Sequence, residues 1–259
     1  ALALKLSPGV LLGLALLLAV RPRSLASASG VAAFALLAFS FAYRVQIGIR
    51  LVLPVVALLL VAVAGATVVS LSALVAAKEP SPGRRALLAA LAALLPLSAL
   101  AASLRVFPDA LCYANPLAGG TGRGHLALSD SNHDWGQGLP ALRHLSADRG
   151  IARIDVWYFG TDPAVERPPF RRVDLVSPAR RDLVEVAAAL SGELLAAGTT
   201  LVHGAYVPEP LPPWLLELRS RAPAFRTRTF LVYDLSAERR RAASATPPHD
   251  PSIRTTSGQ

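Results

Sequence analysis

The sequence has one cysteine and no methionine, and its first 106 residues contain almost no acid. The single cysteine, Cys112, excludes a disulfide within the chain and cannot build a thiolate metal site by itself. Glu79 is the one acid in residues 1–106, which contain nine lysines and arginines and so carry a formal charge of +8. Residues 107–259 contain seventeen bases and sixteen acids, a charge of +1. This uneven distribution predicts two parts, with the basic excess in the first.

The basic excess does not indicate a nucleic-acid partner, although the whole chain carries a net charge of +9. A nucleic-acid interface typically shows a basic face with interleaved aromatic side chains, and the sequence has no such pattern. The bases of the first half lie in short loops between hydrophobic runs. We therefore expect them to meet lipid headgroups or phosphates.

Four hydrophobic runs fill the first half, at residues 2–20, 25–42, 51–77 and 86–104. The last three contain no charged residue. A bilayer core needs roughly 20 apolar residues of helix, and these runs are apolar all round, whereas a helix of a soluble bundle normally has a polar face. The sequence therefore predicts about four transmembrane helices over residues 1–106, with the lipid bilayer as a partner.

The loops between these runs suggest an orientation and a phosphate contact. Loops 21–24 and 78–85 carry five bases, against four on the opposite side, and this small excess predicts that the second half lies outside the cytoplasm. Arg44 and Arg50 flank the remaining loop, where they could clamp a lipid-linked phosphate or extend to headgroups. Because the chain opens inside a hydrophobic run, we expect it to be the C-terminal piece of a longer protein, with a signal peptide as the alternative for residues 1–20.

The second half has the element pattern of a small α/β domain over residues 107–236. Helical spacing predicts helices at 139–148, 182–197 and 213–221, and β-branched or aromatic runs predict strands at 151–159, 199–203 and 229–235. This alternating order favours parallel pairing. Residues 237–259 are rich in Arg, Pro, Ser and Thr, which predicts a disordered tail.

The densest polar stretch is Ser-Asp-Ser-Asn-His-Asp-Trp-Gly-Gln, at residues 129–137. Its alternating oxygen side chains are like those of a calcium loop, but Trp135 and Ala141 stand where the required glycine and acid would be. A hydrolase triad is also disfavoured, because no nucleophile elbow is present. The histidines have no metal-ligand spacing, and the glycine-rich loop 115–124 lacks a P-loop ending. We therefore predict no metal ion or other cofactor. The stretch binds a ligand, caps a helix or docks the domain.

Five stretches in the same order carry a family resemblance: IGIRLVLP at 47–54, YANPLAGG at 113–120, DSNHDWGQ at 130–137, YFG at 158–160 and FLVYDL at 230–235. Together they resemble the C-terminal region of bacterial membrane glycosyltransferases. That group is related to the dolichyl-phosphate-mannose protein mannosyltransferases and the aminoarabinose transferases of the GT-C superfamily.

The resemblance implies an integral protein of the bacterial inner membrane that transfers a sugar from a polyprenyl-phosphate carrier to an unknown acceptor on the extracytoplasmic side. The family's catalytic acid would lie upstream of this chain, so the catalytic residues here are unknown and the chain alone should be inactive. An Arg-His pair expected in the second loop is Arg50-Leu51 here, which puts the role of that histidine in doubt. The candidate substrate-binding residues are Arg44, Arg50, Asp130, Asn132, Asp134, Trp135 and Gln137. The alternative function is a non-catalytic, membrane-anchored module that binds a sugar or a protein.

Overall fold

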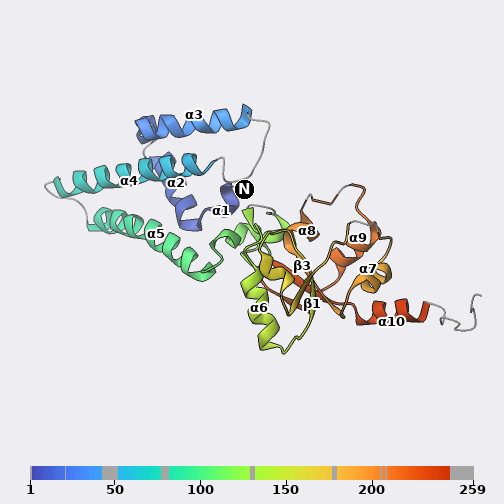
Figure 1. Ribbon diagram of the computed structural model, residues 1–259. Coiled ribbons are helices and arrows are strands. Elements are labelled where there is room, and N and C mark those ends of the chain that lie inside the picture. The colour runs from blue at the N-terminus through green and yellow to red at the C-terminus, as the bar shows by residue number, and fades with distance from the viewer. Residues whose placement is uncertain are drawn as a thin grey trace, which may run out of the picture. The chain divides into compact units, whose positions relative to one another are not determined.

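The computed structural model describes residues 2–20, 22–42, 52–76, 82–128, 132–176, 180–204, 206–207 and 209–245. The chain divides into two compact units, Ala1–Trp135 and Gly136–Gln259. The first, the helical unit, contains helices and turns, and the second, the sheet unit, holds a five-stranded sheet (Figure 1).

Within its described residues, the helical unit contains five α-helices and several short 3-10 turns, the first of which lies between α2 and α3. The α-helices are α1 (Leu2–Lys5), α2 (Pro8–Val20), α3 (Ala28–Ala42), α4 (Leu53–Ala76) and α5 (Pro82–Val106), and the 3-10 turns are η1 (Pro22–Ala26), η3 (Ala110–Cys112), η4 (Pro116–Ala118) and η5 (Gly124–Leu126). Glycines let α2 pack closely on α5, because a Cβ at Gly9 would lie 2.1 Å from Ser98 Oγ and one at Gly13 would lie 2.2 Å from Leu95 Cδ2. Several large apolar side chains of α3, among them Phe34 and Phe39, are exposed.

The prediction of about four transmembrane helices is wrong. Among the ranges given above, no helix combines the length and the apolar character that a bilayer crossing requires. The prediction that the chain is an integral protein of the inner membrane is wrong on the same finding. The run at 2–20 is interrupted between Lys5 and Pro8, which leaves α2 with 13 residues, and α3 has 15, fewer than the roughly 20 that span a bilayer core. For these two runs, hydropathy counts apolar side chains along the sequence but does not show that the helix is shorter than the run.

The sheet unit is built on a mixed sheet with the strand order β2-β1-β3-β5-β4. The strands are β1 (Ile154–Trp157), β2 (Phe170–Arg172), β3 (Leu194–Gly198), β4 (Phe225–Arg226) and β5 (Phe230–Asp234). Strand β1 pairs in parallel with β2 and β3, whereas β5 pairs antiparallel with β3 and β4. Parallel pairing was expected among the strands predicted at 151–159, 199–203 and 229–235, and this is wrong, because 199–203 is helical and β5 pairs antiparallel. The parallel partners of β1 are β2 and β3, which the sequence did not predict as strands.

Both faces of this sheet are covered, because side chains alternate between the faces along each strand. One core cluster joins Trp157, Leu195 and Tyr233 to apolar side chains of α7 (Leu183–Ala189) and α9 (Pro213–Ser220). The other joins Val156, Ala196 and Val232 to Leu139 and Leu142 of α6 (Leu139–Asp148). The other helices among the described residues of this unit are η7 (Pro163–Glu166), α8 (Thr199–His203) and α10 (Ser236–Ala245).

Four element predictions in this unit are confirmed, two are wrong, and the predicted disorder of the tail is wrong where the structure describes the tail. The helices at 139–148 and 213–221 correspond to α6 and α9, and the strands at 151–159 and 229–235 contain β1 and β5. The predicted helix 182–197 is instead the short α7 followed by β3, and the predicted strand 199–203 is the helix α8. The predicted disordered tail begins with the helix α10, while residues 246–259 lie outside the described ranges.

Candidate functional site

The structure describes four of the seven predicted substrate-binding residues. Arg44, Arg50 and Asp130 lie outside the described residues. Asn132 and Gln137 are half-buried, whereas Asp134 is 2% exposed and Trp135 is 51% exposed. The polar stretch is therefore not a uniformly exposed turn, and its charged and aromatic members point in different directions with respect to solvent.

In the helical unit, the neighbours of His133 explain why this part of the stretch is buried. The His133 ring is fully buried, and its centroid lies 5.9 Å from that of the His125 ring. The backbone carbonyl oxygen of His133 accepts a hydrogen bond from Cys112 Sγ at 3.2 Å. Gly124 makes room for this packing, since a Cβ there would lie 2.7 Å from Ala114 Cβ and 3.4 Å from His133 Nδ1. The buried residues thus anchor the segment, and Trp135 remains as its exposed large side chain.

Asn115 fastens the first helix to the turn η4 and has a structural role that the sequence did not reveal. Its Nδ2 donates hydrogen bonds to the carbonyl oxygens of Ala3 and Leu6 at 2.6 and 2.9 Å, and its backbone N–H donates to Leu4 at 2.9 Å. Its Oδ1 accepts from the N–H of Leu117 at 2.9 Å. One buried amide therefore satisfies several backbone groups at a helix end, where such groups have no partner within the helix.

Lys5 is a second residue whose environment the sequence did not predict. Its Nζ donates a hydrogen bond to the Leu111 carbonyl oxygen at 2.6 Å. Burial lowers the pKa of its amine to about 8, and the nearby Cys112 raises this pKa by a smaller amount. The amine is therefore partly neutral at mildly alkaline pH, unlike an ordinary surface lysine.

A cavity of about 510 Å³ lies among α2, α4 and α5 of the helical unit. Its lining is almost wholly aliphatic and consists of Val10, Leu60, Val63, Ala64, Thr67, Val68, Ala92, Leu95, Pro96 and Ala99. The hydroxyl of Thr67 donates a hydrogen bond to the Val63 carbonyl oxygen at 2.8 Å. Because this hydroxyl is engaged within its own helix, the cavity is suited to a hydrocarbon group and not to a polar one.

In the sheet unit, the end of the polar stretch forms a glycine-rich turn, Gly136-Gln137-Gly138, that is packed against two distant segments. The Tyr158 hydroxyl donates a hydrogen bond to the Gly136 carbonyl oxygen at 2.5 Å. Gly136 has φ of +88°, and a Cβ there would lie 2.4 Å from Gly160 Cα. A Cβ at Gly138 would lie 1.6 Å from Thr229 Oγ1. Glycine is therefore required at both positions, at the first also by its backbone conformation.

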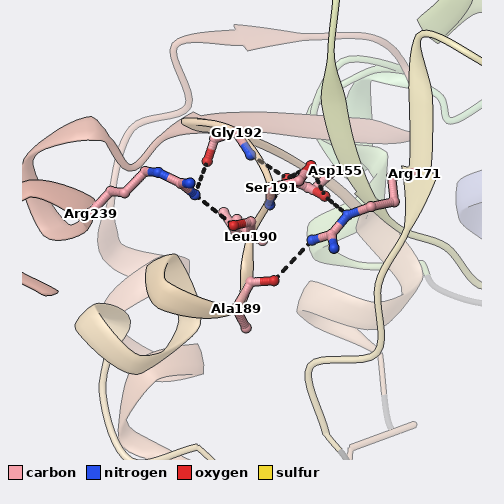
Figure 2. A network of polar contacts seen from close by, with 7 residues as sticks. All are labelled: Asp155, Arg171, Ala189, Leu190, Ser191, Gly192 and Arg239. Carbon is pink, nitrogen blue, oxygen red and sulfur yellow. Dashed lines mark hydrogen bonds and ion pairs between the residues drawn. The ribbon is translucent and has the colours of Figure 1, made fainter. Parts of the chain in front are cut away.

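The sheet unit also contains a buried carboxylate, Asp155, which Figure 2 shows at the centre of a polar network. Asp155 is fully buried and accepts hydrogen bonds from Arg171 Nε, from the N–H groups of Ser191 and Gly192 at 2.8 and 3.0 Å, and from the Ser191 hydroxyl at 3.0 Å. Such a charge-assisted set of bonds fixes the loop between α7 and β3.

Arginines hold the same loop from two sides. Arg239 of α10 donates from Nη1 to the carbonyl oxygens of Leu190 and Gly192 at 2.6 and 3.0 Å, and Arg171 donates from Nη2 to Ala189 at 2.9 Å (Figure 2). These contacts explain why the chain leaves the helix at Ala189 and enters β3. The network is structural and joins α10, which the sequence predicted as disordered, to the sheet.

Among the described residues, no group of three or more His, Cys, Asp or Glu side chains has the arrangement of a metal site. Comparisons with protein-family models, with curated proteins and with solved structures find no match for this chain.

Proposed function

We propose that the chain takes part in sugar transfer from a polyprenyl-phosphate carrier, as the C-terminal part of a glycosyltransferase. The proposal joins the five stretches of the family resemblance to one structural observation, the aliphatic cavity of the helical unit. In this account the chain binds the lipid-linked sugar and does not itself supply the catalytic acid.

The cavity carries the proposal because its size and chemistry suit an isoprenoid chain. A volume of about 510 Å³ falls within the range of ligand pockets, roughly 300–1,000 Å³. Its aliphatic lining would favour methyl-branched hydrocarbon, and burial of such a group is favourable by about 25 cal/mol per Å² of apolar surface. A sugar or a phosphate would lose its hydration there without gaining hydrogen bonds.

The proposed contact for the sugar is Trp135. An exposed indole on an anchored segment offers a flat apolar face on which a pyranose can pack, and it loses little side-chain entropy in doing so. Asp134 is not an acceptor-binding residue in this proposal, because its side chain is buried. Arg44 and Arg50 stay as the proposed phosphate contacts, since negative charge grows on the phosphate as its bond to the sugar breaks.

A binding module without catalytic activity is the second candidate function. It is favoured by the two acids of the polar clusters, Asp134 and Asp155, which are both buried. The two candidates share the sugar contact and differ in transfer, so a binding experiment tests what they have in common and a transfer assay separates them.

Tryptophan fluorescence tests the proposed sugar contact. Trp157 and Trp214 are buried and pack edge to face, with ring centroids 5.3 Å apart, so Trp135 is the exposed indole of the three. Polyprenyl-phosphate sugars with different head groups would be titrated into the full chain in detergent micelles. We expect at least one of them to give a saturable blue shift, which is absent in Trp135→Phe. Leu126→Ala, which removes another exposed apolar side chain of the same unit, is the matched control and should keep the shift.

The cavity is tested with Ala64→Phe and Ala92→Phe, which place a ring in the space proposed for the chain. Both should weaken binding of a polyprenyl phosphate at least tenfold. Unchanged affinity in both variants, with the protein still folded by circular dichroism, would refute the cavity as the lipid site.

A further inference from the structure

The strand order of the sheet unit creates a place where ligands commonly bind in α/β folds. The chain passes from β1 to β2 on one side and then to β3 on the other side of β1. Because β1 is parallel to both neighbours, this reversal puts a switch point at the carboxyl ends of β1 and β3. Ligands of open α/β sheets bind outside such carboxyl ends.

Three segments meet at this end of the sheet. Tyr158, Phe159 and Gly160 follow β1, and Thr199 follows β3. The turn before β5 lies at the same end, since Gly198 pairs with Phe230 in the antiparallel register. The N–H of Thr199 donates to the carbonyl oxygen of Thr229 at 2.8 Å, which joins two of these segments directly.

Thr199 and Thr229 provide an observation independent of the topology. Both side chains are about 1% exposed, and neither hydroxyl has a hydrogen-bond partner among the described residues. Buried hydroxyls normally make hydrogen bonds, because a buried donor or acceptor without a partner loses its hydration and gains no bond in exchange. Here two such hydroxyls belong to residues that share a backbone hydrogen bond at the switch point. We take them as groups that can bind a ligand.

The neighbouring segments suit a ligand that reaches these hydroxyls. Gly138 lies against Thr229 Oγ1, so the hydroxyl is covered at that point by a residue without a side chain. Phe159 and Tyr206 pack with ring centroids 4.5 Å apart, and Tyr206 is 45% exposed. Since Phe159 follows β1 and Thr199 follows β3, the aromatic pair and the hydroxyls belong to segments at the same end of the sheet. Aromatic rings together with hydroxyls that both donate and accept are the usual combination for binding a sugar ring.

We propose that the carboxyl ends of β1 and β3 bind a neutral pyranose. Thr199 and Thr229 exchange hydrogen bonds with its hydroxyl groups, and the Phe159–Tyr206 pair packs against one face of its ring. The turn Gly136-Gln137-Gly138 moves away from Thr229 to admit the sugar. This site lies wholly within residues 136–259, and it goes beyond the proposed function because it does not depend on the cavity or on Trp135.

Saturation-transfer NMR on the full chain tests this site with methyl pyranosides of glucose, mannose, galactose and N-acetylglucosamine. At least one pyranoside should bind saturably, and Thr199→Val and Thr229→Val should each weaken it at least tenfold. Both variants should unfold at or above the temperature of the parent protein, because valine removes an unsatisfied hydroxyl and keeps the shape of the side chain. This makes a loss of binding distinguishable from a loss of folding.

Two controls and an alternative ligand complete the experiment. Thr121→Val, in the helical unit, should leave the affinity unchanged, and Trp135→Ala should do so as well, which separates this site from the one under the proposed function. Failure of all four pyranosides to bind would overturn the inference, as would equal affinity in the Thr199→Val/Thr229→Val double variant. Binding of inorganic phosphate in place of the pyranosides, lost in the same double variant, would also overturn it.

Discussion

The Tyr158 hydroxyl donates a hydrogen bond to the Gly136 carbonyl oxygen at 2.5 Å, 22 residues away along the chain. This bond links the WGQ part of the polar stretch to the YFG stretch that follows β1. Two of the sequence segments that carry the family resemblance therefore contact each other at one turn. This contact gives both segments a structural role.

Tyr158→Phe should lower the free energy of unfolding by about 1 kcal/mol, the usual net worth of one hydrogen bond. The ring should stay in place, because it stacks on Phe230 with centroids 6.1 Å apart. Urea unfolding measures the loss, and hydrogen exchange should show faster exchange at residues 136–138. Tyr113→Phe is the control. Equal protection of the turn in Tyr158→Phe and in the parent protein would contradict the role of this bond.

Gly138→Ala should destabilise the sheet unit, because its Cβ would lie 1.6 Å from Thr229 Oγ1. Overpacking of this kind costs about 1–3 kcal/mol. Gly192→Ala is the matched control, since its nearest neighbour would lie 3.9 Å from the new Cβ. Thermal unfolding of both variants checks the prediction, and similar melting temperatures for the two would show that the turn does not pack as described.

Asp155→Ala should lower the free energy of unfolding by about 3 kcal/mol, because it leaves the N–H groups of Ser191 and Gly192 without their acceptor and removes a charge-assisted bond. The partly exposed Arg171 limits the cost, since water can solvate its charge. The exposed Asp148→Asn is the control, with a change within about 0.5 kcal/mol. A loss below about 1 kcal/mol for Asp155→Ala would refute the network as the anchor of the loop.

Lys5 should make stability depend on pH in the alkaline range. Burial lowers its pKa to about 8, below the ordinary lysine value of 10.5, so the unfolded chain binds more protons between these values. The folded state disfavours the ammonium form, and stability should therefore rise as the pH increases from about 8 towards 10. Urea unfolding at pH 7.5, 8.5 and 9.5, compared with Lys5→Met, isolates this contribution. Parallel pH profiles for the two proteins would contradict it.

Local patterns in the sequence predicted the elements that long-range contacts do not override. The helix α6 coincides with its predicted bounds because Leu139, Leu142 and Leu145 share one face that packs on the sheet. The helix predicted over 182–197 began correctly, with the Asp182 side chain accepting from the N–H of Glu185, but it ended early. The ion pair and hydrogen bonds of Asp155 fix the loop at 189–192, and this distant residue cannot be identified as a partner from local propensity.

The candidate site was less predictable because composition does not show burial. His133 and Asp134 are polar and were expected at the surface, but both are buried in the helical unit. There the His133 ring packs near His125, and the His133 carbonyl oxygen accepts a hydrogen bond from Cys112. Trp135 and Gln137 stay candidates, and ligand contact by either is still a prediction. Asn115, Lys5 and Thr229 gave no signal, since each owes its role to residues far away in sequence.

Calorimetric titration with a matched pair of lipids tests the central claim most directly. The full chain would be titrated with a polyprenyl phosphate that carries the sugar selected by fluorescence and with the same lipid lacking the sugar. We predict saturable binding of both, with the sugar adding at least tenfold in affinity and Trp135→Ala removing that increment alone. Equal affinity for the two lipids, or no binding of either, would contradict the assignment to sugar transfer from a polyprenyl-phosphate carrier.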